Sequence, residues 1–336
     1  MACFANQIAM TAPTRQGVIL KELQRDDALD LYYKMSISRA LEQKCVDLSG
    51  LWYPSIGEEA AIVGTFWSAE DDDVLYPHYR GSMVVQWMRG RPLEDIFRAM
   101  LHREGSASKG RHAPPFDGFP AGGVMPFATI MLGPNLAMAA GTALALQHRQ
   151  SSAIAVCAFG DGTSGTGDFH ETLNLAAVLK LPTVFVCQNN QFSISTSAGS
   201  ALAAPVHHWA AGYGMPSVQV DGNEVRAVTE AIGESIAYTR ESRQPSFVEL
   251  TTYRRTGHFA ADPARYRDKG ELRRAEQADP LERLGTYITS GLAVDHDDLR
   301  VVGDRAADEI AAAFERASAG RALTSEDLDL TGVYAR

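Results

Sequence analysis

Residues 153–190 read AIAVCAFGDGTSGTGDFHETLNLAAVLKLPTVFVCQNN, and their hydrophobic pattern indicates a strand, a helix and a second strand. Residues 153–159 and 183–187 are short apolar runs of strand length, while apolar side chains in residues 168–180 recur at helical spacing. Neither run alternates apolar with polar residues, which is typical of strands buried on both faces of a parallel sheet. The segment therefore predicts a βαβ unit within a doubly wound, mostly parallel α/β fold.

Residues 160–165, GDGTSG, match the glycine pattern of dinucleotide-binding folds. A nicotinamide site of that type needs an acidic residue about 20 positions later, at the end of the second strand. No Asp or Glu lies between Glu171 and Asp221, and Asp161 stands inside the pattern, where its carboxylate would repel a pyrophosphate. The segment therefore fails the test for a nicotinamide site.

Asp161 and Asn190 follow two strands that are predicted to run in the same direction, so both should lie at the carboxyl edge of the sheet. Their side-chain oxygens, together with the backbone carbonyl of Phe192, are the kind of ligands that Mg²⁺ shares with substrate phosphates. The glycines beside Asp161 allow backbone N–H groups to approach a diphosphate. Asp-Gly and Asn-Asn are also common turn formers, but their occurrence at matching strand ends favours a metal and diphosphate site.

The segment from GDG to NN resembles the thiamine diphosphate motif, with Asp161 and Asn190 lying 29 positions apart. The sequence between them is similar to that of the alpha subunits of the first component of 2-oxo acid dehydrogenase complexes. That family includes the pyruvate, branched-chain 2-oxo acid and acetoin enzymes, and the resemblance extends from about Leu31 to Pro280. It implies three parts, namely an N-terminal tail (1–25), a thiamine-diphosphate-binding and Mg²⁺-binding α/β domain (26–270) and a helical C-terminal segment (271–336).

Three further segments carry the resemblance. In PHYRGS, Tyr79 and Arg80 occupy the position of a Tyr-Arg pair that faces the diphosphate, and an Arg fork suits phosphate oxygens. The stretch MPFAT (125–129) resembles the branched-chain SPLAT segment, whose backbone contacts the aminopyrimidine ring, and this implies the same role for Met125, Pro126 and Phe127. The stretch TYRRTGHFAADP places His258 at the position of the family's loop histidine, with Arg254 and Arg265 nearby to bind anions. The resemblance thus implies a cofactor-binding set of Tyr79, Arg80, Met125, Phe127, Gly160, Asp161, Gly162, Thr163, Asn190, Phe192, Ser193 and His258, with His258 catalytic and with Asp161, Asn190 and Phe192 on the metal.

Other polar residues receive a structural interpretation. Glu58 and Glu59 open a predicted helix, where the helix dipole favours carboxylates. The pair His207-His208 has no metal-ligand spacing with a Cys or carboxylate cluster and is expected in a loop. Ser82 stands where pyruvate-type members often carry a His, which weakens an assignment to pyruvate.

Composition restricts the classes of partner. The 336-residue chain has a net charge of −10, which argues against nucleic acid, and it contains no run of 18 apolar residues that would span a membrane. Its four cysteines show no disulfide framework, and the first residues lack the pattern of a signal peptide. A cytoplasmic protein is expected.

The resemblance implies that the cofactor carries the chemistry, which is the decarboxylation of a 2-oxo acid and the transfer of the acyl group to a lipoyl acceptor. It also implies a beta-type subunit that supplies the glutamate on the pyrimidine side of the cofactor in an α₂β₂ heterotetramer, and a lipoyl acyltransferase as a further partner. Two alternatives remain open: a thiamine-diphosphate-dependent carboligase of the same two-subunit architecture, and a non-catalytic homologue.

Overall fold

The computed structural model of the chain describes residues 22–111, 114–127 and 131–327. At its centre is a five-stranded sheet in the order β1-β2-β3-β7-β6, in which every neighbouring pair is parallel. The strands are β1 (Val74–Tyr76), β2 (Ala155–Gly160), β3 (Thr183–Asn189), β6 (Ser217–Asp221) and β7 (Ser246–Thr251). Strands β2 and β3 are buried along their whole length, and the predicted α/β class is confirmed.

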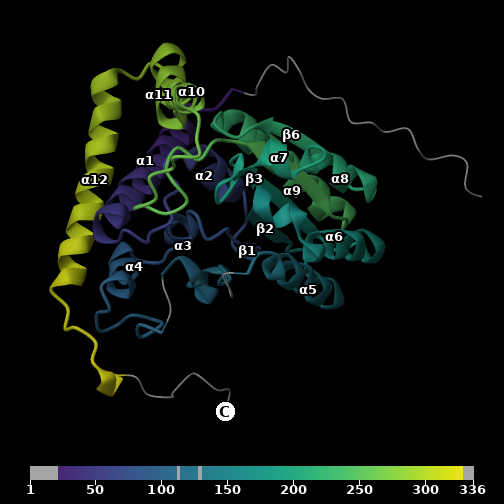
Figure 1. The fold of residues 1–336 in the computed structure, drawn as a ribbon, viewed down its shortest axis with the longest axis horizontal. Helices are drawn as coiled ribbons and strands as arrows, with labels where there is room; N and C mark the ends of the chain where they lie inside the picture. Colours follow the sequence, from purple (N-terminus) through teal and green to yellow (C-terminus); the bar gives the residue numbers. More distant parts are fainter. Residues whose placement is uncertain (1–21, 112–113, 128–130, 328–336) are drawn as a thin grey trace, which may run out of the picture.

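Helices cover both faces of this sheet (Figure 1). Residues Val156 and Ala158 of β2 face one layer, while Cys157 and Phe159 face the other. The first layer contains α1 (Arg25–Leu48), α2 (Glu59–Trp67), α3 (Ser82–Met88), α4 (Leu93–Met100) and α9 (Val225–Ser242), and the second contains α5 (Pro134–His148), α6 (Gly167–Leu179) and α8 (Val206–Gly212). Short 3₁₀ turns occur at Pro114–Phe116, Pro120–Gly122, Asp161–Gly165 and Ser325–Asp327.

The chain ends in the helical extension that the sequence predicted. It comprises α10 (Lys269–Gln277), α11 (Pro280–Gly291) and α12 (His296–Ser318). The long helix α12 buries Ile310, Ala313 and Ala317 against α1 and α4. Residues 1–21 of the expected tail and residues 328–336 lie outside the described part of the chain. Within the described residues, no helix combines the length and the apolar character needed to cross a membrane.

The segment between β3 and β6 contains more regular structure than its sequence indicated. It forms a small hairpin of β4 (Phe192–Ser193) and β5 (Thr196–Ser197), followed by α7 (Ala198–Ala201) and α8. The expectation that His207 and His208 lie in a loop was wrong, because both belong to α8. This helix begins directly after Pro205 and buries Val206 and Ala210. At 7 residues it is too short to show the apolar period that identifies longer helices.

Candidate functional site

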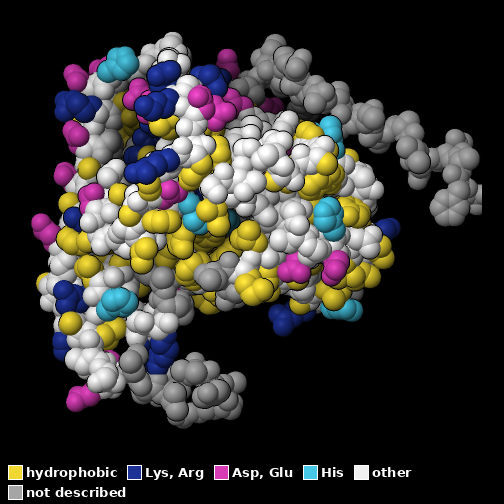
Figure 2. All heavy atoms as spheres, viewed as in Figure 1, with side chains coloured by type: hydrophobic (Ala, Val, Ile, Leu, Met, Phe, Trp, Pro, Cys, Tyr) yellow, Lys and Arg dark blue, Asp and Glu magenta, His cyan; other side chains and the backbone are white. Residues whose placement is uncertain are grey.

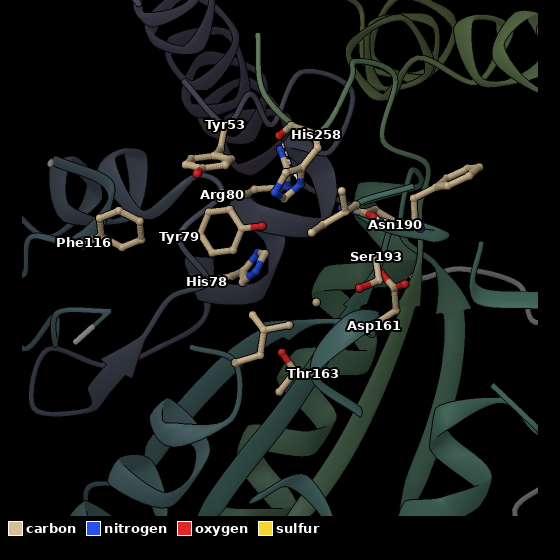
Figure 3. A pocket seen from close by; sticks show the side chains of 15 residues that line it. Tyr53, His78, Tyr79, Arg80, Phe116, Asp161, Thr163, Asn190, Ser193 and His258 are labelled. Carbon is tan, nitrogen blue, oxygen red and sulfur yellow. Dashed lines mark hydrogen bonds between the residues drawn. The ribbon is translucent and has the colours of Figure 1, made fainter. Parts of the chain in front are cut away.

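A pocket opens at the carboxyl edge of β2 and β3 (Figure 3). It is lined by Tyr53, His78, Tyr79, Arg80, Phe116, Leu132, Gly160, Asp161, Gly162, Thr163, Asn190, Phe192, Ser193, Ile194 and His258. The structure thus brings together all of the predicted cofactor residues except Met125 and Phe127. The reason is the parallel register of the sheet, in which Gly160 pairs with Gln188, so that β2 and β3 end side by side.

Asp161 is the carboxylate at the centre of this edge. It follows β2 directly and is buried, and burial raises the pKa of its carboxyl group to about 6. Backbone N–H groups of Asp161 and Asn190 hydrogen-bond to the carboxylate and oppose that shift. Gly162 brings the loop close to β4, because a Cβ atom there would lie 2.5 Å from Oγ of Ser193. A small residue is therefore required where the backbone turns past the carboxylate.

Asn190 has a fixed orientation beside this carboxylate. Its side-chain Nδ2 donates to both carboxylate oxygens of Glu58, each at 3.2 Å, and its Oδ1 accepts from the backbone N–H of Phe192 at 3.3 Å. Glu58 is buried, and burial raises the pKa of its carboxyl group to about 7. The structural interpretation of Glu58 missed its contact with a predicted metal ligand. No sequence signal could have found it, because the two residues are 132 positions apart.

The oxygen-rich set of Asp161, Asn190 and the Phe192 carbonyl fits Mg²⁺ by the chemistry of its donors. Within the described residues, no three His, Cys, Asp or Glu side chains form a group that could hold a metal ion. The Phe192 carbonyl also accepts from Arg254 at 3.3 Å. A carbonyl oxygen has two lone pairs, so this bond leaves one for a cation.

Arg254 does not play the anion-binding part expected of it. Its guanidinium is buried and donates to the carbonyl oxygens of Phe192 and Ile194 and to the hydroxyl of Tyr266. These contacts fix the β4–β5 hairpin instead of facing a ligand. Arg265 is exposed on the same loop.

Arg80 joins the pocket to the loop that carries His258. Its guanidinium is buried and donates to the carbonyl of Pro54 at 2.7 Å, to the carbonyl of His258 at 2.8 Å and to the His258 ring nitrogen Nδ1 at 3.1 Å. Burial, with Arg80 and Arg254 adding to it, lowers the pKa of His258 to about 4. Because guanidinium is only a donor, Nδ1 accepts, and the neutral ring carries its proton on Nε2.

Aromatic residues that the sequence did not single out form the opposite wall (Figure 3). Tyr53 packs edge-on against Tyr79 and His258, with ring centroids 5.3 and 5.2 Å apart. His78, beside Tyr79, is buried, and burial lowers its pKa to about 3, so it is neutral. Phe116 comes from the turn at Pro114–Phe116 and completes the wall.

Met125 and Phe127 do not line the pocket. The Met125 N–H donates to the carbonyl of Leu75, which attaches the segment to β1. Phe127 is buried behind the wall, with its ring 5.5 Å from that of Tyr79 and 6.2 Å from that of Phe116. The assignment of Met125 and Phe127 to the aminopyrimidine ring concerns backbone groups of the segment, and it stays a prediction. The last two residues of MPFAT lie outside the described part of the chain.

We expect no phosphorylation switch in residues 253–270. The family resemblance implies that kinase-controlled members carry a Ser directly after the loop His, whereas this chain has Phe259 there, and Thr256 is the candidate hydroxyl next to His258 in the sequence. The Thr256 carbonyl accepts from Arg254 and Arg267, which holds this residue inside the loop network. Phosphosite mapping of the purified protein, followed by activity assays of Thr256→Glu, checks this expectation. A natural phosphate in this loop that silences activity would contradict it.

The chain is similar to known proteins over most of its length. A family model described as Dehydrogenase E1 component matches residues 27–326. The chain is 29% identical over 314 residues to the pyruvate dehydrogenase E1 component subunit alpha of Rhizobium meliloti, covering 88% of this chain and 86% of that protein. It is 35% identical over 286 residues to the 3-methyl-2-oxobutanoate dehydrogenase subunit alpha of Mycobacterium tuberculosis, covering 82% of this chain and 74% of that protein. It is 33% identical over 307 residues to the pyruvate dehydrogenase E1 component subunit alpha of Staphylococcus epidermidis, covering 89% of this chain and 80% of that protein.

The family model covers almost the whole of the described structure, from the start of α1 to the last turn. The similar proteins are named as alpha subunits of dehydrogenases that act on two different 2-oxo acids. The chain therefore belongs to the Dehydrogenase E1 component family.

Proposed function

We propose that this chain is the alpha-type subunit of a thiamine-diphosphate-dependent 2-oxo acid dehydrogenase and that it anchors the cofactor diphosphate through Mg²⁺. The observation that carries the proposal is that Asp161, Asn190 and Phe192 line one pocket together with Arg80 and His258. Bound thiamine diphosphate supplies the electron-accepting ring for decarboxylation. Asp161 and Asn190 would hold the metal, and the N–H groups of residues 160–163 would face the phosphate oxygens.

His258 is the residue to which we assign proton transfer. Its imidazole is neutral at physiological pH because burial and two guanidinium groups keep its pKa near 4. With Nδ1 accepting from Arg80, the Nε2–H is the proton available to donate into the pocket. Tyr53 packs against one side of the ring, and the Arg80 bond to the His258 carbonyl fixes the backbone. The histidine is thus oriented before any ligand enters.

A beta-type partner subunit is part of the proposal, as an α₂β₂ heterotetramer. Among the described residues that line the pocket, Asp161 is the only carboxylate, and it is assigned to the metal. The acid that precedes MPFAT most closely in the sequence is Asp117, whose carboxylate lies 3.6 Å from the buried guanidinium of Arg91. The glutamate needed to ionise the cofactor would therefore come from another chain.

A surface suited to that partner lies on α5 and α6. Leu175, Val178 and Leu179 form an apolar stripe along α6, and they are 50%, 68% and 41% exposed. Met138 of α5, 37% exposed, also contributes. We call these four residues the α5–α6 apolar surface. Gly133, at the start of α5, lies against Asp168 of α6, so the two helices meet where the pocket loop begins. Apolar area of this kind usually marks a protein interface.

The distribution of side chains on the visible face agrees with an open site. Figure 2 shows apolar side chains gathered in the middle of the face, while charged side chains crowd over the C-terminal helices.

The reported relatives are named dehydrogenases, which does not favour the carboligase alternative. Transfer of the acyl group to a lipoyl acyltransferase and a cytoplasmic location complete the proposal.

The direct test is release of carbon dioxide by this chain assembled with its beta-type partner. We expect thiamine-diphosphate-dependent release from 2-oxo acids and reductive acylation of a lipoyl domain. A panel of pyruvate and branched-chain 2-oxo acids identifies the substrate. Formation of an acyloin with no acyl-lipoyl product would instead establish the carboligase.

His258→Ala is expected to lower the turnover of the assembled enzyme by about 10²–10⁴-fold, the range for loss of one proton-transfer group. The variant should still assemble, because the His258 carbonyl keeps its hydrogen bond from Arg80. Steady-state assays at saturating cofactor give the comparison. His208→Ala, an exposed histidine on α8, is the matched control and should retain wild-type turnover. A loss within about twofold for His258→Ala would make it a bystander.

A further inference from the structure

Glu249 is a fully buried carboxylate on β7 that has no place in the site as described so far. Its Oε1 accepts from the side-chain Nδ2 of Asn189 at 2.7 Å. Its Oε2 accepts from the backbone N–H of His207 at 3.1 Å and from the His207 ring nitrogen Nδ1 at 2.7 Å. The network therefore joins α8 to the end of β3 through one carboxylate.

Asn189 links this network to the turn at Gln191, between Asn190 and Phe192. Its Oδ1 accepts from the backbone N–H of Gln191 at 3.2 Å and from the Gln191 side chain at 3.0 Å. Gln191 has a positive φ of 72°, a conformation that a non-glycine residue adopts only when its surroundings impose it. The turn at Gln191 sets where Asn190 and the Phe192 carbonyl lie, since these residues flank it on both sides.

We propose that Glu249 and His207 are positioning residues for the Mg²⁺ site. They orient the Asn189 amide and thereby hold the turn that presents Asn190 and the Phe192 carbonyl. This inference rests on the proposed metal site. Glu249 acts from behind the strand ends, while Glu58, directly before α2, holds the Asn190 amide itself.

The chemistry of the network supports a role beyond packing. A buried carboxylate is costly to desolvate, and a protein with well-packed apolar side chains at such positions is often as stable as one with the buried charges, or more stable. On the same face of β7, two residues before it, Phe247 is such an apolar residue. The carboxylate also directs its shortest side-chain contacts at groups whose orientation matters, an amide and a ring nitrogen. Groups of this kind behind metal ligands typically change metal affinity about 10–100-fold when they are replaced.

The test uses the enzyme assembled with its beta-type partner, with Mn²⁺ as the probe metal in the presence of thiamine diphosphate. Glu249→Gln keeps the shape of the side chain but replaces one acceptor oxygen by an N–H₂ group, which then faces the donors of Asn189 or His207. His207→Phe removes the ring donor, and His207→Asn can restore a donor close to the position of Nδ1. Glu241→Gln, at an exposed position on α9, is the matched control. Electron paramagnetic resonance gives the Mn²⁺ dissociation constant, and turnover is measured against Mn²⁺ concentration.

We expect a Mn²⁺ dissociation constant raised about 10–100-fold in Glu249→Gln, raised less in His207→Phe and near wild type in His207→Asn. Turnover at saturating Mn²⁺ should return to within about twofold of wild type, as it does when only binding is weakened. Unchanged Mn²⁺ affinity in folded His207→Phe and Glu249→Gln would overturn the proposal, as would a turnover loss that saturating metal does not restore. If the wild-type enzyme itself fails to bind Mn²⁺ with the cofactor, the proposed metal site fails instead.

Discussion

Asp161→Ala is expected to abolish Mg²⁺-dependent binding of thiamine diphosphate while leaving the fold intact. Asp161 is the only carboxylate that lines the described part of the pocket, so its loss removes the one formal negative charge among the proposed ligands. The loss of affinity should exceed the roughly 10–100-fold that replacement of groups behind a metal ligand typically causes. The fold should survive because Asp161 makes no salt bridge within the described residues, and burial already disfavours its charged form by raising the pKa of its carboxyl group to about 6.

Isothermal titration calorimetry on the assembled enzyme measures this effect. Asp221→Ala is a matched control, because Asp221 ends β6 of the same sheet but pairs with Arg283 at the surface. The metal requires the carboxylate form, so the affinity of the wild type should also fall as the pH drops below about 6, where Asp161 becomes protonated. Unchanged cofactor affinity in Asp161→Ala would remove the central assignment.

The chain on its own is expected to bind thiamine diphosphate weakly and to turn over no 2-oxo acid, with activity appearing when a beta-type subunit is added. The described lining of the pocket contains one carboxylate, Asp161, which we assign to the metal, and two neutral histidines, so it offers no second carboxylate to ionise the cofactor. Glu42 and Glu58 are buried close by, yet neither lines the pocket, and both are engaged by hydrogen bonds to this chain's own groups. The difference between the single chain and the pair should therefore be between no detectable turnover and full turnover.

Cofactor-dependent release of carbon dioxide, measured for the single chain and again for the pair, decides this. Val178→Glu places a charge on the α5–α6 apolar surface and should weaken the gain on mixing, because burying an unpaired charge at an interface is costly. Val301→Glu is the control, since Val301 is similarly exposed on α12, at 60%. Full turnover by the single chain would mean that the general base lies in this sequence. An undiminished gain with Val178→Glu would locate the partner on another surface.

Several features follow from the sequence alone because they depend on local pattern. The apolar runs around residues 153–190 were sufficient to predict β2, α6 and β3, since buried parallel strands and the helix between them have distinct periods. The absence of an acid after β3 excluded a nicotinamide site. The GDG and NN motifs, with the PHYRGS and GHF segments, led to the family and to ten residues that line one pocket.

What only the tertiary structure decided is which distant groups meet. Glu58 reaches Asn190 and Glu249 reaches His207, 132 and 42 positions away, and no local pattern encodes such pairs. Arg254 looked like an anion-binding residue, but burial requires its donors to be satisfied, and they bind the hairpin carbonyls of Phe192 and Ile194 and the hydroxyl of Tyr266. Phe127 does not line the pocket because the rings of His78, Tyr79 and Phe116 pack against it and form the wall themselves. The sequence determined the strand ends and the chemistry placed on them, whereas the packing of layers determined which side chains face the ligand and which hold the others in position.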